Sequence, residues 1–299
     1  MKYEFHTASH ALEIAKKYRI TISELAKRYE SERAQKSTST IRNKMKVTRD
    51  VMYDAVKRGV KSSHISQSGM SGTDAHKMFN SLEKMDKMMG NKTTIRAMAY
   101  AMAVGEENSR MGRIVAFPTA GGAGVVPGVL FSCSEHFKAG KRRLLRGMFT
   151  AAAVGLLIAE NATISAAKGG CQAEVGAAAA MAAAGLTEMR NGTPHQCFDA
   201  AAIALKSYLG LACDTIGGLV EVPCIKRNAI GCMAAIGASD IVMSGIKSYV
   251  PFDEVVKSMN NIAQMMSPKI RETAMGGLAV TKTGNKIKRK YGLPINDEI

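Results

Sequence analysis

CQAEVGAAAAMAAAGL, at Cys171–Leu186, is the stretch that decides the fold. Eight of its sixteen residues are alanine, and no charged residue follows Glu174 within it. Alanine has the highest intrinsic helix propensity, and its small side chain lets neighbouring helices approach closely. The stretch therefore predicts a buried central helix, over Cys171–Arg190, with other helices packed around it.

Helical patterning continues on both sides of this stretch. Apolar residues recur at steps of three and four, the spacing of one helix face. The other predicted helices are His10–Tyr18, Ile22–Tyr29, Ile41–Arg58, Asp74–Met89, Thr94–Val104, a helix from near Val129, Lys141–Ala159, Pro194–Leu209, Ile225–Ser239 and Asp253–Met266. Strand-like alternation is confined to the short runs 113–116 and 219–222. We therefore expect an all-α fold, a single helical domain with glycine-rich loops and at most short strand segments.

Composition and charge bound the organisation of the chain. Its 299 residues are 46% apolar, which is enough for a real core, and its formal charge is +16. Residues 1–62 carry 15 basic and seven acidic side chains, which is half of that net charge. We expect a basic N-terminal helical lobe over 1–62, a helical main domain over 63–284 and a basic tail over 285–299.

Two features argue against a membrane-bound or secreted protein. The longest uncharged run, 114–134, contains two prolines and several glycines, which would leave backbone groups unpaired in hydrocarbon. The first ten residues, MKYEFHTASH, lack the apolar stretch of a secretory signal, and six cysteines are too sparse for a disulfide scaffold. We expect a cytoplasmic protein with free thiols and no membrane partner.

The six cysteines divide into two groups by their sequence surroundings. Those that lie within apolar or helical patterns, as small core residues often do, are Cys133, Cys197 and Cys232. Those that lie at predicted helix–loop junctions, where a thiolate can be stabilised, are Cys171, Cys213 and Cys224. Their separations, 42 and 11 residues, match no compact cluster motif. On spacing alone, three core thiols are favoured over a metal site.

Two loops rich in glycine and hydroxyl groups, Ser68–Thr73 and Thr119–Gly124, could hold a carboxylate through their backbone N–H groups. Plain turns explain most such loops. No lysine followed by serine or threonine completes a phosphate-binding loop, and no strand–helix–strand unit is present in the pattern, so a nucleotide site is not expected.

Three long stretches carry a resemblance to a known family. They are SRMGRIVAFPTAGGAGVVPGVL (109–130), NATISAAKGGCQAEVGAAAAMAAAGL (161–186) and LGLACDTIGGLVEVPCIKRNAIG (209–231). Together with similar segments near 68–78 and 251–284, they resemble the iron–sulfur-dependent L-serine dehydratases, from about residue 10 to residue 284. The chain looks like the α subunit of the two-subunit form of these enzymes.

This resemblance implies a [4Fe–4S] cluster held by Cys171, Cys213 and Cys224. Three thiolate ligands leave one iron open to a substrate oxygen, whereas four would close the cluster. The implied reaction is β-elimination of water from L-serine, which ends in pyruvate and ammonia and belongs to amino-acid catabolism. The implied partner is the β subunit, so we expect a hetero-oligomer.

The resemblance also suggests roles for the loops. It makes Ser68, Ser71, Thr119 and Gly121 the candidates for substrate binding. His64, next to the first loop, is the best candidate in this chain for the catalytic base, although a lone histidine is more often structural. The β subunit of this family carries a histidine motif that approaches the site, so it is a second source of the base.

Residues beside the cysteines are weaker candidates for supporting roles. They are Asn161, Ser165, Glu174, Arg227 and Asn228. Arg227 could pair with a substrate carboxylate through its two-pronged guanidinium, or anchor a helix to the chain's own acids.

Three alternative functions are weighed. A related lyase could act on L-cysteine. A pyridoxal enzyme could also carry out the elimination, but it needs a lysine to bind its cofactor, and only Lys168 faintly suggests one. The basic start of the chain could indicate a nucleic-acid-binding protein. With no tryptophan and 5% aromatic residues, the chain lacks stacking groups, and we expect no nucleic-acid partner.

Overall fold

The computed structural model describes residues 1–292 of the chain and confirms the all-α prediction. Thirteen α-helices and several single-turn 3₁₀ or π segments make up its regular structure, and residues 1–292 contain no strand. The closest approach to one is an isolated parallel bridge between Cys213 and Arg271.

The helix bounds follow the predicted ones closely in the first half and the centre of the chain. In chain order the helices are α1 Ala8–Tyr18, α2 Ile22–Arg33, α3 Thr38–Lys61, α4 Asp74–Asn80, α5 Lys92–Ser109, α6 Val125–His136, α7 Lys141–Asn161, α8 Ala166–Gly169, α9 Ala177–Met189, α10 Pro194–Lys206, α11 Cys224–Met243, α12 Phe252–Met265 and α13 Lys282–Lys290.

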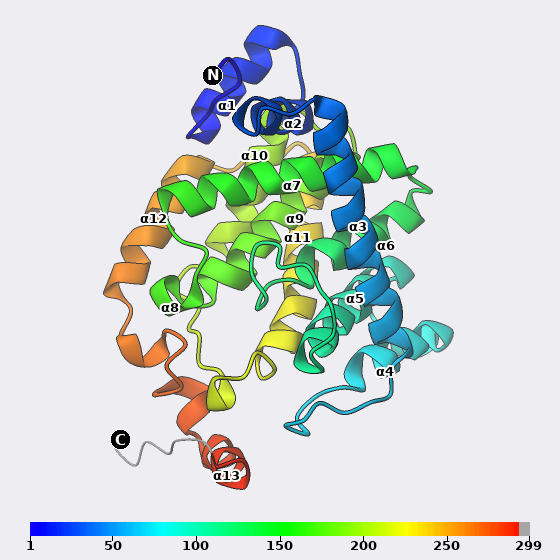
Figure 1. Ribbon diagram of the computed structural model, residues 1–299, viewed down its shortest axis with the longest axis vertical. Coiled ribbons are helices and arrows are strands. Elements are labelled where there is room, and N and C mark those ends of the chain that lie inside the picture. The colour runs from blue at the N-terminus through cyan, green and yellow to red at the C-terminus, as the bar shows by residue number, and fades with distance from the viewer. Residues whose placement is uncertain (293–299) are drawn as a thin grey trace.

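The alanine-rich helix α9 is the centre of the molecule (Figure 1). Every one of its thirteen residues is buried, and α6, α7, α10 and α11 pack around it. A Cβ atom on Gly185 would lie 2.6 Å from the backbone oxygen of Gly147, so glycine is required where α7 crosses α9. Small side chains therefore allow the close packing that the sequence predicted.

The N-terminal helices cover this centre from one side. α2 packs against α7 and α3 against α5, and Phe5, Leu25 and Val56 belong to the same hydrophobic core as α9. The carboxylate of Asp253, at the start of α12, accepts hydrogen bonds from the backbone N–H groups of Ala8 (2.7 Å) and Ser9 (3.0 Å). The start of α1 is thereby fixed to α12.

Several local predictions were wrong. The helix predicted over 74–89 ends at Asn80 and continues as two 3₁₀ turns, because the following methionines are at most half-buried and Met89 is fully exposed, so packing does not favour a regular helix there. The runs 113–116 and 219–222 are irregular, since no neighbouring chain pairs with them. The helix expected near Val129 begins at Val125.

The predicted basic tail, 285–299, falls partly within a helix that the sequence analysis did not foresee. α13 reaches Lys290, and residues 293–299 lie outside the described part. The side chain of Lys288 is buried, and its Nζ donates to the backbone oxygen of Ala274 at 3.0 Å. This contact fixes α13 to the segment before it.

One helix, α7, is long and apolar enough to cross a membrane. Its apolar window is 67% buried against the other helices, as in the core helix of a globular protein. The uncharged run 114–134 is an irregular loop up to Gly124, and its helical part is buried within the protein.

Candidate metal centre

Three segments far apart in the chain bring Cys171, Cys213 and Cys224 into one buried region. Cys171 lies between α8 and the π turn Gln172–Gly176 that leads into α9. The backbone N–H of Cys213 donates to Ile270 (2.8 Å), and its oxygen accepts from the N–H of Glu272 (2.9 Å). Cys224 is the first residue of α11. None of the three side chains is more than 2% exposed.

Cys171 needs the chain before it to turn sharply. Gly170 has φ +71°, in the left-handed region that favours glycine. A Cβ atom there would lie 2.8 Å from the backbone oxygen of Leu211 and closer still to Met266. The two glycines before this cysteine therefore let the loop before Cys213 lie directly against it.

The sulfur atoms of Cys171 and Cys213 and a carboxylate oxygen of Glu174 all lie within 4.8 Å of one another. These distances place two thiols within reach of one metal group. The carboxyl of Glu174 is buried, and burial raises its pKa, while the nearby hydroxyl of Thr119 opposes the shift. A buried, thiol-rich pocket of this kind suits a soft metal.

The three thiols differ in how far the groups around them stabilise the thiolate form. A hydrogen bond from Cys213 and the guanidinium of Arg227 lower the pKa of Cys171, against the effect of burial. The pKa of Cys213 is raised by the same hydrogen bond and by burial, and burial and the charge of Cys171 raise the pKa of Cys224. Cys171 is therefore the thiol of this cluster that most readily becomes a thiolate.

Arg227, one turn into α11, connects the thiols. Its guanidinium lies 3.5 Å from the sulfur of Cys171, donates to the backbone oxygen of Ala212 at 2.8 Å and forms a 3.0 Å ion pair with Asp214. Asp214 also accepts the N–H of Leu278 at 2.9 Å. One side chain therefore holds the loops on both sides of Cys213, and its guanidinium is occupied by the chain's own groups.

The predicted loop Thr119–Gly124 lies against Glu174. A Cβ atom on Gly121 would be 2.2 Å from the Oε2 atom of Glu174, so no larger residue fits there without moving the carboxyl. Asn228 holds the same loop: its Nδ2 donates to the oxygen of Gly121 (2.6 Å), and its Oδ1 accepts the N–H of Gly124 (3.0 Å). The structure thus brings Thr119 and Gly121 to the buried thiols.

The first predicted loop, Ser68–Thr73, is held in place by a residue that the sequence did not indicate. The carboxylate of Glu221, three residues before Cys224, accepts hydrogen bonds from the hydroxyls of Ser66 (2.6 Å), Ser68 (2.8 Å) and Ser71 (2.5 Å). The side chains of Ser68 and Ser71 are therefore used to attach this loop to the segment that carries Cys224. A pattern of three serines within six residues was the available signal.

A second buried carboxylate fixes the end of that loop. Glu106, on α5, accepts the N–H groups of Gly72 (3.2 Å), Asp74 (2.7 Å) and Ala75 (3.3 Å). It replaces the side-chain cap that Thr73 does not provide at the start of α4. The loop is thus held at both ends by buried carboxylates, one on α5 and one in the segment before α11.

The backbone of His64 lies beside the Ser68–Thr73 loop, because Arg110 donates to the backbone oxygens of both His64 (3.1 Å) and Gly72 (2.9 Å). The side chain of His64 is exposed, and its Nδ1 lies 3.4 Å from the hydroxyl of Ser62. Asn161 donates to the oxygens of His6 (2.7 Å) and Leu157 (2.9 Å), an arrangement that caps the end of α7. Within residues 1–292, neither side chain makes a hydrogen bond to the three thiols.

The residues present fit a metal group. Two thiols lie within reach of one metal group, Cys224 is close enough for the charge of Cys171 to raise its pKa, and the cation of Arg227 stabilises thiolate charge, which together suit an iron–sulfur ligand set. Two buried polar atoms on the same segments, Oγ1 of Thr215 and Nε of Arg271, have no hydrogen-bond partner within the described residues. Polar atoms of this kind are expected where a polar ligand binds.

Comparisons with known proteins identify the family. The family model for the serine dehydratase alpha chain matches residues 17–279. The chain is 44% identical over 286 residues to "Probable L-serine dehydratase, alpha chain" of Bacillus subtilis, covering 96% of this chain and 95% of the relative. It is 37% identical, over 96% of its length and 98% of the relative, to "L-serine dehydratase, alpha chain" of Peptoniphilus asaccharolyticus.

A longer relative shows the same similarity over part of its length. The "L-serine dehydratase" of Streptomyces coelicolor is 38% identical, over 94% of this chain but only 62% of the relative. These matches confirm the resemblance that the three long stretches suggested. The chain belongs to the serine dehydratase alpha chain family.

Proposed function

We propose that this chain is the α subunit of an L-serine dehydratase, which removes water from L-serine to give pyruvate and ammonia. The relatives that it matches over nearly their whole length carry that name. The single observation that supports the chemistry best is the convergence of Cys171, Cys213 and Cys224, from three separate segments, in one buried region with Arg227.

Cys171, Cys213 and Cys224 would hold a [4Fe–4S] cluster. When bound by three thiolates, such a cluster supplies a Lewis acid at its remaining iron, which makes the β-hydroxyl of serine a better leaving group. The role of Arg227 is to stabilise the thiolate of Cys171 and to hold the Cys213 loop in place. Both roles act through the ligands and require no contact with substrate.

The substrate carboxylate would bind to groups of this chain that are not used elsewhere. The candidates are the backbone N–H groups of Gly121 and Gly122 and the Nε of Arg271, because the N–H of Gly124 is bonded to Asn228 and Arg227 is paired with Asp214. Ser68 and Ser71 would act by holding their loop through Glu221. These groups orient L-serine and exclude water from the site.

The proton on the α-carbon must pass to a base. His64 remains the candidate in this chain, and the partner β subunit is the other source. The variant His64→Asn separates them. A loss of activity of more than about 100-fold with normal iron content would support His64, as expected for removal of a general base. Unchanged activity would assign the base to the partner.

The protein would work in the cytoplasm together with a β subunit, as the alpha-chain names of its relatives suggest. The decisive experiment is anaerobic purification of the full chain with and without that partner. We expect a brown protein with about four iron and four acid-labile sulfide atoms per chain, and pyruvate formation from L-serine that needs the partner.

Other outcomes of the same experiment would change the proposal. A colourless protein that forms pyruvate in air would contradict the cluster-dependent mechanism. Efficient release of sulfide from L-cysteine, with little reaction on L-serine, would instead indicate the related lyase that acts on L-cysteine.

A further inference from the structure

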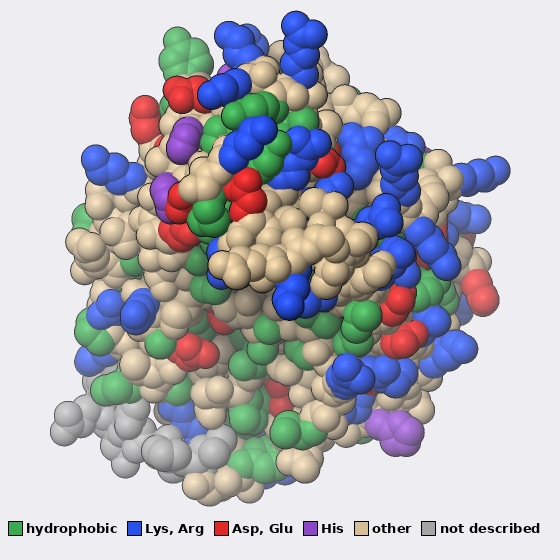
Figure 2. Space-filling model, turned by 45° about the horizontal axis from the view of Figure 1, so that its top comes forward, with side chains coloured by type: hydrophobic (Ala, Val, Ile, Leu, Met, Phe, Trp, Pro, Cys, Tyr) green, Lys and Arg blue, Asp and Glu red, His purple; other side chains and the backbone are tan. Residues whose placement is uncertain are grey.

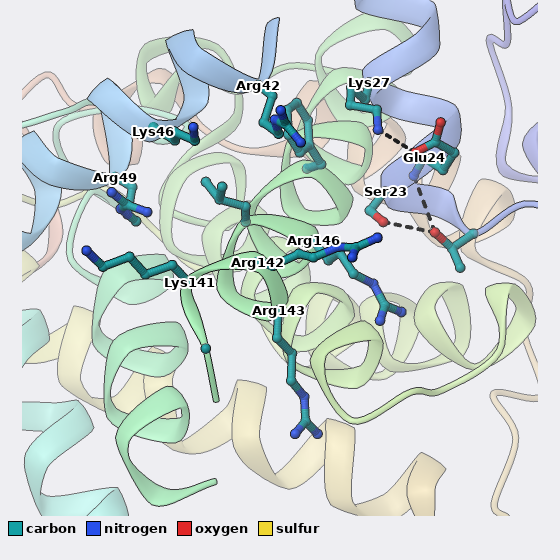
Figure 3. Close-up of a pocket in the computed structure, with 14 residues that line it drawn as sticks. Ser23, Glu24, Lys27, Arg42, Lys46, Arg49, Lys141, Arg142, Arg143 and Arg146 are labelled. Atoms are coloured by element: carbon teal, nitrogen blue, oxygen red, sulfur yellow. Dashed lines mark hydrogen bonds and ion pairs between the residues drawn. The ribbon is translucent and has the colours of Figure 1, made fainter. Parts of the chain in front are cut away.

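A strongly basic groove lies between α2, α3 and α7, with a volume of about 1040 Å³ (Figure 3). Eight lysine and arginine side chains line it, with one carboxylate, that of Glu24. The cationic residues are Lys27, Arg42, Lys46, Arg49, Lys141–Arg143 and Arg146. Figure 2 shows lysine and arginine side chains gathered on one side of this end of the molecule. None of the groove's residues belongs to the metal centre.

α3 contributes three cations from one of its faces. Arg42, Lys46 and Arg49 are spaced by four and three residues, so they lie on the same side of the helix, where like charges repel one another. Arg49 is paired with the exposed Asp50 (2.6 Å). Arg42 makes no ion pair within residues 1–292. The face is therefore electrostatically unfavourable without an added anion.

The opposite wall is the beginning of α7. This helix starts after Gly140 with no side-chain cap and no acidic residue in its first turn, where Lys141, Arg142 and Arg143 stand instead. The N-terminal end of a helix carries partial positive charge and favours anions. α12, by contrast, has Asp253 and Glu254 in its first turn. Arg143 donates to the backbone oxygen of Met189, so Lys141 and Arg142 are the cations at this position that a bound anion would stabilise.

The remaining walls compensate only part of this charge. Glu24 is itself paired with Lys27 and, at 2.7 Å, with Arg28. The buried side chain of Glu188 pairs with Arg146 at 3.4 Å and accepts hydrogen bonds from Ser23 and Thr150. Leu145 and Phe149 complete the groove with apolar surface. In Figure 3, Lys27, Arg42, Lys46, Arg49, Lys141, Arg142 and Arg146 surround a common hollow.

We propose that this groove binds a small polyanion that carries two or more phosphoryl groups. Arginine side chains bind phosphate through two parallel hydrogen bonds, and a helix N-terminus adds backbone donors. The volume is at the upper end of the range for small-molecule sites, about 300–1000 Å³. A nucleic acid is disfavoured, because the aromatic residue of the groove, Phe149, is only 6% exposed and offers no ring face for stacking bases.

The test is calorimetric titration of the full-length chain with inorganic pyrophosphate and, separately, with ATP and adenosine at low salt. We expect saturable binding of pyrophosphate, weakened about tenfold or more by Lys141→Gln or Arg42→Gln. Tighter binding of ATP than of pyrophosphate would support the site and identify a nucleotide as the source of the phosphates. Equal binding of adenosine and ATP would overturn the role of the phosphates.

Lys92→Gln is the matched control. Lys92 is, like Lys141, an exposed lysine at the first position of a long helix, but it lies on α5 and outside the groove. The same substitution there should leave pyrophosphate binding unchanged. Equal weakening by both lysine variants would overturn the proposal, as would the absence of saturable binding. Duplex DNA that binds more tightly than ATP, and whose binding is weakened by Arg42→Gln, would assign the groove to nucleic acid instead.

Discussion

The two groups of cysteines are equally buried but differ in what surrounds them. Cys133, Cys197 and Cys232 lie inside α6, α10 and α11, where burial raises the pKa of each thiol, that of Cys133 to about 12. Cys171, Cys213 and Cys224 lie where helices begin or loops meet. Of all six, only Cys171 has a lowered pKa, because Cys213 and Arg227 stabilise its charge.

This comparison shows that burial alone does not distinguish a structural thiol from a metal ligand. The distinguishing features are irregular backbone, which brings separate segments together, and a fixed cation beside the sulfur. In α6, α10 and α11, regular helix geometry places the core cysteines on separate helix axes. At the junctions, the sulfur atoms of Cys171 and Cys213 come within 4.8 Å of each other, and Cys224 lies near enough for the charge of Cys171 to raise its pKa.

The largest difference between the two groups should appear when serine replaces cysteine. Cys171→Ser, Cys213→Ser and Cys224→Ser should each remove most of the iron and lower dehydratase activity by more than about 100-fold, because a hydroxyl is a poor ligand for iron. Cys197→Ser is the matched control and should keep both. Iron analysis and the visible absorbance of anaerobic protein measure this difference. Normal iron in all three variants would contradict the ligand assignment.

Arg227 tests the role of the cation. We expect Arg227→Gln to lower activity by about 10- to 100-fold while much of the iron remains, because the loop that carries Cys213 loses its anchor. The buried Asp214 would lose its partner, at a cost of about 2 kcal/mol in the free energy of unfolding. Arg227→Lys keeps the charge without the two-pronged geometry and should fall between. Activity and iron content per chain, measured together, distinguish this outcome from simple unfolding.

Gly121 tests the packing beside the thiols. Gly121→Ala would force the carboxyl of Glu174 to move, since the added carbon meets it at 2.2 Å. We expect a loss of stability of about 1–3 kcal/mol and reduced iron content. Gly237→Ala on α11 is the control, because nothing lies within 4 Å of its added carbon. That variant should be neutral or slightly more stable in thermal unfolding.

Substitutions of the core cysteines should have the smallest effects, and the loss of stability should differ between Cys197 and Cys232. Cys197→Ser buries a hydroxyl with no oxygen acceptor among the contacts that the structure describes, which costs about 2 kcal/mol. Cys232→Ser should cost about 1 kcal/mol or less, because the sulfur lies 3.6 Å from the backbone oxygens of Ala97 and Val125. Chemical unfolding measures both. A larger cost for Cys232→Ser would contradict the hydrogen-bond argument.

The sequence predicted the helices better than the loops. The alanine-rich centre, and helices such as α2 and α7, follow from propensity and periodicity, which act over short distances. The same periodicity failed over 81–89, where methionines recur at helical spacing but are at most half-buried. Local pattern does not report whether a partner surface exists.

The candidate site was predictable in a different way. The three cysteines came from a family resemblance, whereas their spacing favoured plain core thiols. Glu221 and Arg271 were missed because each contacts residues more than fifty positions away in the chain, and Asp214 because it joins Arg227 to the distant Leu278; no short motif marks such contacts. Ser68 and Ser71 were noticed for their hydroxyls, but the acceptor that holds them was not.

The closure of the chain over its thiols has a consequence for maturation of the protein. The isolated bridge between Cys213 and Arg271 holds the C-terminal segment beside a cysteine whose side chain, like those of Cys171 and Cys224, is almost inaccessible to solvent. If these cysteines hold an iron–sulfur cluster, the cluster must be inserted before the C-terminal segment packs beside them, or that segment must move away to admit it. Protein made during iron starvation would then fold without its cluster. After iron returns, it would gain the cluster only as fast as the C-terminal segment moves away.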